Sequence, residues 1–170
     1  MKNYKEIDGW ASMEEQGELL KTICKKGMRV AEVGVFKGRM SMMIMEMFDR
    51  KLEYHCIDHF QGSAEHERRD YLPEFLENTS RSGVWLCAGS SVEVAKGFDD
   101  GFFDIVYLDA SHDYLSVKQD IEAWWPKVRT GGVLCGDDYI AGWPGVIQAV
   151  DEAFGDKVQR VAGQQWWVEV

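Results

Sequence analysis

Apolar runs of strand length alternate with helical patterns along the chain. Seven apolar segments predict β-strands, at residues 28–33, 53–57, 84–88, 103–108, 133–136, 157–162 and 165–170. Apolar positions at helical spacing predict helices, at residues 12–27, 39–50, 64–79, 91–97, 114–125 and 146–154. Strands that alternate with helices indicate βαβ units and a mostly parallel sheet.

The order of these elements predicts an α/β fold with a doubly wound, mostly parallel seven-stranded sheet. The last two strands are joined by a short connection, so we expect an antiparallel edge strand. No repeat, low-complexity tract or linker interrupts the pattern. We therefore expect a single domain over residues 1–170, with residues 1–27 as an N-terminal helical segment.

The chain has 170 residues, a formal net charge of −10 and 45% hydrophobic residues, which suit a folded acidic domain. The acidic surplus argues against nucleic acid or an anionic membrane as the main partner, because both attract basic patches. No apolar run approaches the roughly 20 residues that span a bilayer. Four widely spaced cysteines and an N-terminus unlike a signal peptide favour a reducing, cytoplasmic location.

The first predicted strand ends on Glu32-Val33-Gly34-Val35-Phe36-Lys37-Gly38, just before a helix. Gly34 and Gly38 allow a tight turn and a close approach of the backbone to a ligand. The spacing differs from the Gly-x-Gly-x-x-Gly of dinucleotide sites, and no Gly-Lys-Ser/Thr follows as in phosphate loops. This loop alone is weak evidence, since such turns are also merely structural.

Asp58 ends the second predicted strand, where an acid about 20 residues beyond the glycine loop can accept hydrogen bonds from ribose hydroxyls. His59 and Phe60 follow, and an aromatic ring there could cover an adenine face. The third strand ends on Gly89-Ser90-Ser91, whose hydroxyls either contact a ligand or cap the next helix. Together these strand ends favour a ligand that contains adenosine.

Three aspartates fall at the ends of the fourth and fifth predicted strands, namely Asp109 and the pair Asp137 and Asp138. These strands are usually neighbours in such a sheet, which would bring three carboxylates to one rim. Like charges are costly together unless a cation offsets them, and oxygen ligands favour a hard ion such as Mg²⁺, Ca²⁺ or Mn²⁺. The alternative is that one aspartate caps a helix and another faces water.

His112 lies three residues after Asp109, in a loop between a strand and a helix. A neutral histidine there could take a proton from a substrate hydroxyl, and the neighbouring acids favour this role over that of a hydrogen-bonding fixture. Trp10 and Trp143 are the two tryptophans in predicted loops, so they are the candidates for stacking on a sugar.

These residues resemble the class I S-adenosylmethionine-dependent methyltransferases, over almost the whole chain. Within that class they are similar to the small-molecule O-methyltransferase group that includes macrocin O-methyltransferase and proteins labelled cephalosporin hydroxylase. The resemblance rests on residues 7–10, 30–41, 57–63 and, most specifically, 103–139. It implies a Rossmann-like methyltransferase fold.

The resemblance also implies roles for individual residues. Glu32 and the glycine loop would hold the methionine part of S-adenosyl-L-methionine, Asp58 would hold the ribose, and Ser90 and Ser91 would lie near the adenine. The candidate cofactor-binding residues are Glu32, Gly34, Phe36, Gly38, Ser41, Asp58, His59, Ser90, Ser91 and Asp109. In metal-dependent relatives the positions of Asp109, Asp137 and Asp138 hold a divalent cation, for which we expect Mg²⁺.

Two departures from the family pattern matter. Some relatives have Asp-x-Asp where this chain has Asp109-Ala110-Ser111, so His112 becomes the candidate base. Larger relatives carry N-terminal or lid segments that enclose the acceptor, and 170 residues leave little room for them. The cover would come from residues 60–82, residues 139–145 or a second subunit of a homodimer.

The sequence therefore predicts methyl transfer to a hydroxyl oxygen of a small molecule, such as a sugar or glycosylated metabolite, assisted by a divalent cation. His112 and Asp109 are the candidate catalytic residues. One rival is a non-catalytic protein, a cofactor-binding module or scaffold that keeps the cofactor pocket. The other is a nicotinamide-dependent oxidoreductase, which would need the dinucleotide motif that this chain lacks.

Overall fold

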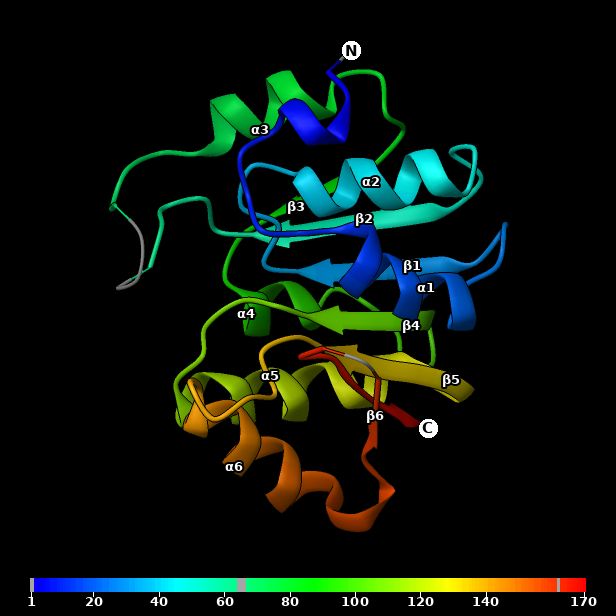
Figure 1. Cartoon of the computed structure of the whole chain (residues 1–170), viewed down its shortest axis with the longest axis vertical. Coiled ribbons are helices and arrows are strands. Elements are labelled where there is room, and N and C mark those ends of the chain that lie inside the picture. Colours follow the sequence, from blue (N-terminus) through cyan, green and yellow to red (C-terminus); the bar gives the residue numbers. More distant parts are fainter. Residues whose placement is uncertain (1, 64–66, 162) are drawn as a thin grey trace.

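A computed structural model describes residues 2–63, 67–161 and 163–170. Its centre is a seven-stranded sheet with the order β3-β2-β1-β4-β5-β7-β6 (Figure 1). The strands are β1 (Arg29–Val33), β2 (Glu53–Asp58), β3 (Trp85–Ala88), β4 (Phe103–Leu108), β5 (Val128–Gly136), β6 (Gln159–Arg160) and β7 (Trp166–Glu169). The predicted α/β class and seven-stranded sheet are confirmed.

The first five strands run parallel, so their carboxyl ends meet at one edge of the sheet. β7 runs antiparallel to β5, and the short β6 pairs antiparallel with β7. β7 is therefore second from the edge of the sheet, because β6 lies outside it as the edge strand. The strand order reverses at β1, between β2 and β4, which is where such sheets bind ligands.

Helices cover both faces of the sheet. They are α1 (Glu18–Ile23), α2 (Arg39–Met47), α3 (Leu72–Thr79), α4 (Ser91–Ala95), α5 (Tyr114–Trp124) and α6 (Pro144–Phe154). Four short turns add to them, at Tyr4–Glu6, Met13–Gly17, Trp125–Lys127 and Gly155–Lys157. No helix in the described part of the chain has the length and apolar character that crossing a membrane requires.

Two predicted helices differ from the structure. The segment predicted at 64–79 begins only at Leu72, where Pro73 occupies the first turn, and residues 64–66 lie outside the described residues. The N-terminal segment is helical in pieces rather than continuously. The Gly17 N–H closes a π-turn at Met13–Gly17 by donating to the Ser12 carbonyl at 3.1 Å, and the Ser12 N–H donates to the Gln16 side-chain oxygen at 2.9 Å.

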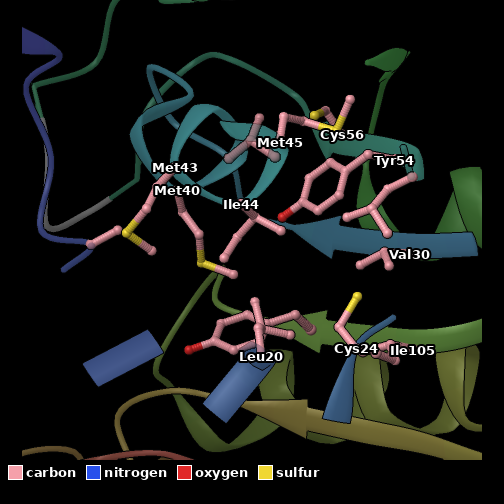
Figure 2. Packing of buried hydrophobic residues seen from close by; sticks show 14 of the residues in the cluster. Leu20, Cys24, Val30, Met40, Met43, Ile44, Met45, Tyr54, Cys56 and Ile105 are labelled. Carbon is pink, nitrogen blue, oxygen red and sulfur yellow. The ribbon is translucent and has the colours of Figure 1, made fainter. Parts of the chain in front are cut away.

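The core has one cluster on each face of the sheet. On one face α2 packs its methionines against the strands, and α1 adds Leu20 and its C-cap residue Cys24 (Figure 2). On the other face α5 and α6 pack around the fully buried Trp124 and Trp166. Trp167 packs on the opposite face from Trp166, as alternation along a strand requires. Both layers hold the carboxyl ends of the strands in fixed positions.

Candidate active site

A cavity of about 520 Å³ opens at the carboxyl ends of the parallel strands. Residues at the ends of β1, β2, β4 and β5 line it, together with residues of the N-terminal segment (residues 2–27). This position is the switch point of the sheet. The predicted ligand site therefore coincides with a cavity large enough for a small-molecule ligand.

The glycine loop after β1 packs against the end of β4. Gly34 has a φ of +93°, and a Cβ atom there would lie 2.0 Å from the Asp109 carbonyl oxygen. Only glycine fits this position, because both the backbone conformation and the contact exclude a side chain. The glycine thereby brings the β1 loop directly beside Asp109.

Asp58 at the end of β2 holds the glycine loop. Its Oδ2 accepts hydrogen bonds from the backbone N–H groups of Val35 and Phe36 at 3.0 and 2.9 Å, and its Oδ1 accepts one from Phe60 at 2.7 Å. The carboxylate also lines the cavity, as does the half-exposed His59. The predicted spacing between loop and acid therefore corresponds to a direct contact between them.

Glu32 is buried at the cavity wall beneath the glycine loop. Its Oε2 accepts hydrogen bonds from the hydroxyls of Ser41 at 2.6 Å and Tyr54 at 2.8 Å. Burial raises the pKa of Glu32 to about 8, despite these two hydrogen bonds. A cationic ligand group beside Glu32 would favour its charged form.

Three predicted cofactor-binding residues lie outside the cavity lining, namely Gly38, Ser41 and Ser90. Gly38 faces α3, since a Cβ atom there would lie 2.8 Å from a methyl group of Thr79. The Ser41 hydroxyl points at Glu32 from within the core. Ser90 occupies the N-cap position of α4 without a side-chain hydrogen bond to the helix.

Ser91 lines the cavity, but its hydroxyl also has partners within the protein. It donates to Asp120 at 2.5 Å and accepts from the Trp124 indole N–H at 2.8 Å. Ser91 thus connects the end of β3 with α5. Burial raises the pKa of Asp120 to about 6.

An acidic group with one histidine lies at the ends of β4 and β5. One ligand atom from each of Asp109, His112 and Asp138 falls within 4.8 Å of the others. The His112 Nε2 lies 2.8 Å from Asp138 Oδ2 and 4.0 Å from Asp109 Oδ1. Burial, with the nearby charges of Asp137 and Asp138, raises the pKa of Asp109 to about 6. Two carboxylates and an imidazole are suitable ligands for a divalent cation. Such a cation would offset the repulsion between the neighbouring carboxylates.

Asp137 stands apart from this group, in contrast to the predicted set of three aspartates. Its Oδ1 accepts hydrogen bonds from the Gln165 side chain and the Asp138 backbone, both at 2.9 Å. Its Oδ2 accepts hydrogen bonds from the Gln16 side chain and, at 3.3 Å, from the Tyr107 hydroxyl. Because both oxygens are engaged, Asp137 ties the N-terminal segment to the end of β5.

The N-cap residue and the first turn of α6 pack against the loop that carries His112. The Trp143 ring stacks on the imidazole, with centroids 4.4 Å apart and an interplanar angle of 26°. Gly145 lies so close that a Cβ atom there would be 2.7 Å from the His112 carbonyl oxygen. His112 therefore has a restricted orientation, whereas its sequence position alone predicts only a loop between a strand and a helix.

The N-terminal segment forms a wall of the cavity, of which the sequence predicted only Trp10 as a site residue. Arg39 holds this wall, because its guanidinium donates to the carbonyls of Ile7 and Ala11, both at 2.8 Å. Trp10 lies over Phe36 with centroids 5.4 Å apart. Gln16 was missed altogether, because a glutamine in an amphipathic pattern carries no signal of a long-range partner.

A protein-family model and several solved structures that match the chain are described as methyltransferases. The family model described as a methyltransferase domain matches residues 31–139, which is more than half of the chain. No curated protein shows significant sequence similarity to the chain. The family match spans the glycine loop, Asp58 and the whole Asp109–Asp138 region.

Several solved structures share the fold at low sequence identity. CalS11, a TDP-rhamnose 3′-O-methyltransferase of calicheamicin biosynthesis, has a TM-score of 0.65 and 17% identity, over 92% of this chain and 77% of its own. A putative caffeoyl-CoA O-methyltransferase from Staphylococcus aureus has a TM-score of 0.71 and 13% identity, over 98% and 87%.

MycE, a methyltransferase of the mycinamycin pathway solved with Mg and SAH, has a TM-score of 0.61 and 20% identity, over 92% of this chain and 48% of its own. The resemblance expected from the motifs is thus confirmed. The chain belongs to the methyltransferase domain family and has the fold of the class I S-adenosylmethionine-dependent methyltransferases.

Proposed function

We propose that the protein transfers a methyl group from S-adenosyl-L-methionine to a hydroxyl oxygen of a small molecule. The observation that carries the proposal is one continuous cavity. It joins Glu32, the glycine loop and Asp58 on one side to Asp109, His112 and Asp138 on the other. The first set suits an amino-acid nucleoside and the second suits a hydroxyl group that must lose a proton.

The cofactor side of the cavity has partners for the ribose and for the ammonium group of the ligand. Asp58 accepts hydrogen bonds from ribose hydroxyls on lone pairs that the loop N–H groups leave open. Glu32, in its charged form, pairs with the ammonium group of the methionine part. When bound, S-adenosyl-L-methionine supplies a methyl group on a positively charged sulfur, which a nucleophilic oxygen can attack directly.

The acceptor side of the cavity takes up the proton of the acceptor hydroxyl and orients that hydroxyl. His112 accepts the proton, and Asp138, 2.8 Å from Nε2, stabilises the imidazolium that results. Asp109 and Asp138 would hold a divalent cation, with His112 as a third donor when it does not act as base. Such a cation would lower the pKa of the acceptor hydroxyl.

A sugar-like acceptor fits the two tryptophans that line the cavity. Trp10 and Trp143 offer flat apolar faces of the kind that stack on pyranose rings. CalS11, which shares the fold, is described as acting on the sugar of TDP-rhamnose, a nucleoside-diphosphate sugar. This likeness supports a polyol acceptor. For this chain the main support is the pair of tryptophans in the cavity lining.

Calorimetry tests the proposal directly. Purified protein is titrated with S-adenosyl-L-methionine, S-adenosylhomocysteine and NAD, each with and without Mg²⁺. We expect both sulfur ligands to bind and NAD to give no heat. Tight NAD binding without a response to either sulfur ligand would establish the oxidoreductase rival instead. A protein that binds cofactor but transfers no methyl group to any polyol in an acceptor screen would be a binding module.

A further inference from the structure

We infer that the acceptor is a hydroxyl compound without phosphate or carboxylate groups, either a neutral polyol or one that carries an amine. The inference rests on the proposed function and names the substrate class of the same cavity. It follows from which charged side chains reach the cavity and which of them already have partners.

The acceptor side of the cavity is lined by carboxylates. Asp109, Asp137 and Asp138 lie at the ends of β4 and β5, and the half-buried Glu15 adds a fourth from the N-terminal segment. Asp8 also lines the cavity, but it pairs with Lys37 at 2.8 Å. A bound divalent cation would offset two of the four remaining negative charges, so the surface stays acidic even when a cation is present.

The cations nearby are already engaged. Among the lining residues that the structure describes, Arg39 is the one lysine or arginine, and its guanidinium donates to two backbone carbonyls. Lys37 pairs with Asp8 and, at 3.2 Å, with Glu74, away from the lining. A diphosphate or carboxylate would enter without a strong cationic donor, which is costly in a partly desolvated cavity.

The uncharged part of the lining suits the same class of acceptor. Trp10 is 71% exposed and overlies Phe36 at the cavity wall. Aromatic faces attract both the C–H faces of polyol rings and ammonium groups. The carboxylates accept hydrogen bonds from hydroxyl and ammonium donors, but they repel anions. The cavity therefore differs from one suited to a nucleoside-diphosphate sugar.

A matched set of pyranosides isolates the effect of charge. The probes are methyl α-D-glucosaminide, methyl α-D-glucopyranoside and methyl α-D-glucuronide, which share a ring and carry a positive, zero and negative charge. Each is titrated into protein saturated with S-adenosylhomocysteine, and binding is followed by tryptophan fluorescence and ligand-observed NMR. We expect the glucuronide to bind about tenfold more weakly than the neutral glucoside, and the glucosaminide to bind at least as well as the glucoside.

Two variants of adjacent residues provide the control. Glu15→Gln removes a carboxylate from the cavity wall and should reduce the discrimination against the glucuronide about threefold. Glu14→Gln removes the same charge from an exposed position outside the lining and should leave the three affinities as in the wild type. Higher salt should weaken the discrimination in the wild type as well.

The outcomes separate this inference from the proposed function. A glucuronide that binds as tightly as the glucoside overturns the inference, and so does the absence of binding by all three probes at their highest soluble concentrations. In both cases binding of S-adenosylhomocysteine leaves the proposed function standing. Failure of S-adenosylhomocysteine itself to bind contradicts the proposed function, whatever the probes do.

Discussion

The indole of Trp143 stacks on the imidazole of His112, with ring centroids 4.4 Å apart. The contact joins the N-cap residue of α6 to the loop after β4, so two segments about 30 residues apart fix the orientation of the proposed proton acceptor. Stacked aromatic pairs contribute about 0.5–1.5 kcal/mol beyond the area they bury. At this site the fixed orientation of the His112 imidazole matters more than the stacking energy.

Trp143→Ala should release the imidazole, whereas Trp143→Phe should keep it in place. We expect the alanine variant to lose about 10- to 100-fold in methyl-transfer rate, because a small displacement of a reacting group has an effect of that size. The His112 ring signals in ¹⁵N NMR should broaden in the alanine variant only. Equal rates in the two variants would contradict a positioning role for Trp143.

Gly34→Ala should destabilise the protein far more than Gly27→Ala. Both glycines have a positive φ, +93° and +90°, but a Cβ atom at 34 meets the Asp109 carbonyl oxygen, while one at 27 meets nothing within 4 Å. We expect the free energy of unfolding to fall by about 1 kcal/mol at 27 and by about 3 kcal/mol or more at 34. Urea denaturation measures both, and equal losses would rule out a close approach between the two loops.

The titration of Glu32 should make the free energy of unfolding fall as the pH rises. Its pKa in the folded protein is about 8, above the ordinary value of 4.5, so between these values the folded state holds a proton that the unfolded state has lost. We expect the free energy of unfolding to decrease between pH 5 and 8, at up to about 1.4 kcal/mol per pH unit. Denaturation curves of Glu32→Gln should have a smaller slope. An identical slope would show that Glu32 titrates normally.

The same titration should appear in cofactor binding. Pairing with the ligand's ammonium group requires charged Glu32, so the affinity for S-adenosylhomocysteine should increase from pH 6 to pH 8 and proton release should accompany binding. Calorimetry in buffers of different ionisation enthalpy counts these protons. Binding by Glu32→Gln should be weaker and independent of pH over this range. A wild-type affinity that does not change with pH would contradict this pairing.

Asp137 and Asp138 should respond differently to the same substitution. Asp138→Asn removes a candidate cation ligand, so Mn²⁺ affinity should fall at least about tenfold with little loss of stability. Asp137→Asn removes an acceptor shared by Gln16, Gln165 and Tyr107, so the free energy of unfolding should fall by about 2–3 kcal/mol. Mn²⁺ electron paramagnetic resonance and urea denaturation measure the two effects. Equal loss of Mn²⁺ binding in both variants would place Asp137 among the ligands.

The sequence alone determined the order of strands and helices, because the alternation of apolar and polar residues is a local property of each element. It also identified the strand ends that line the cavity, since parallel strands bring their carboxyl ends to one edge of a sheet. Glu32, Gly34, Asp58, Asp109 and His112 were predicted in this way, and all of them line the cavity.

The tertiary structure decided what each of these side chains touches. Ser41 points into the core rather than the cavity, and Asp137 binds Gln16 from 121 residues away. The N-terminal segment became a wall of the cavity through Arg39 and its two backbone acceptors. Local patterns do not encode such contacts, because the choice among polar partners depends on which groups folding brings within hydrogen-bonding distance.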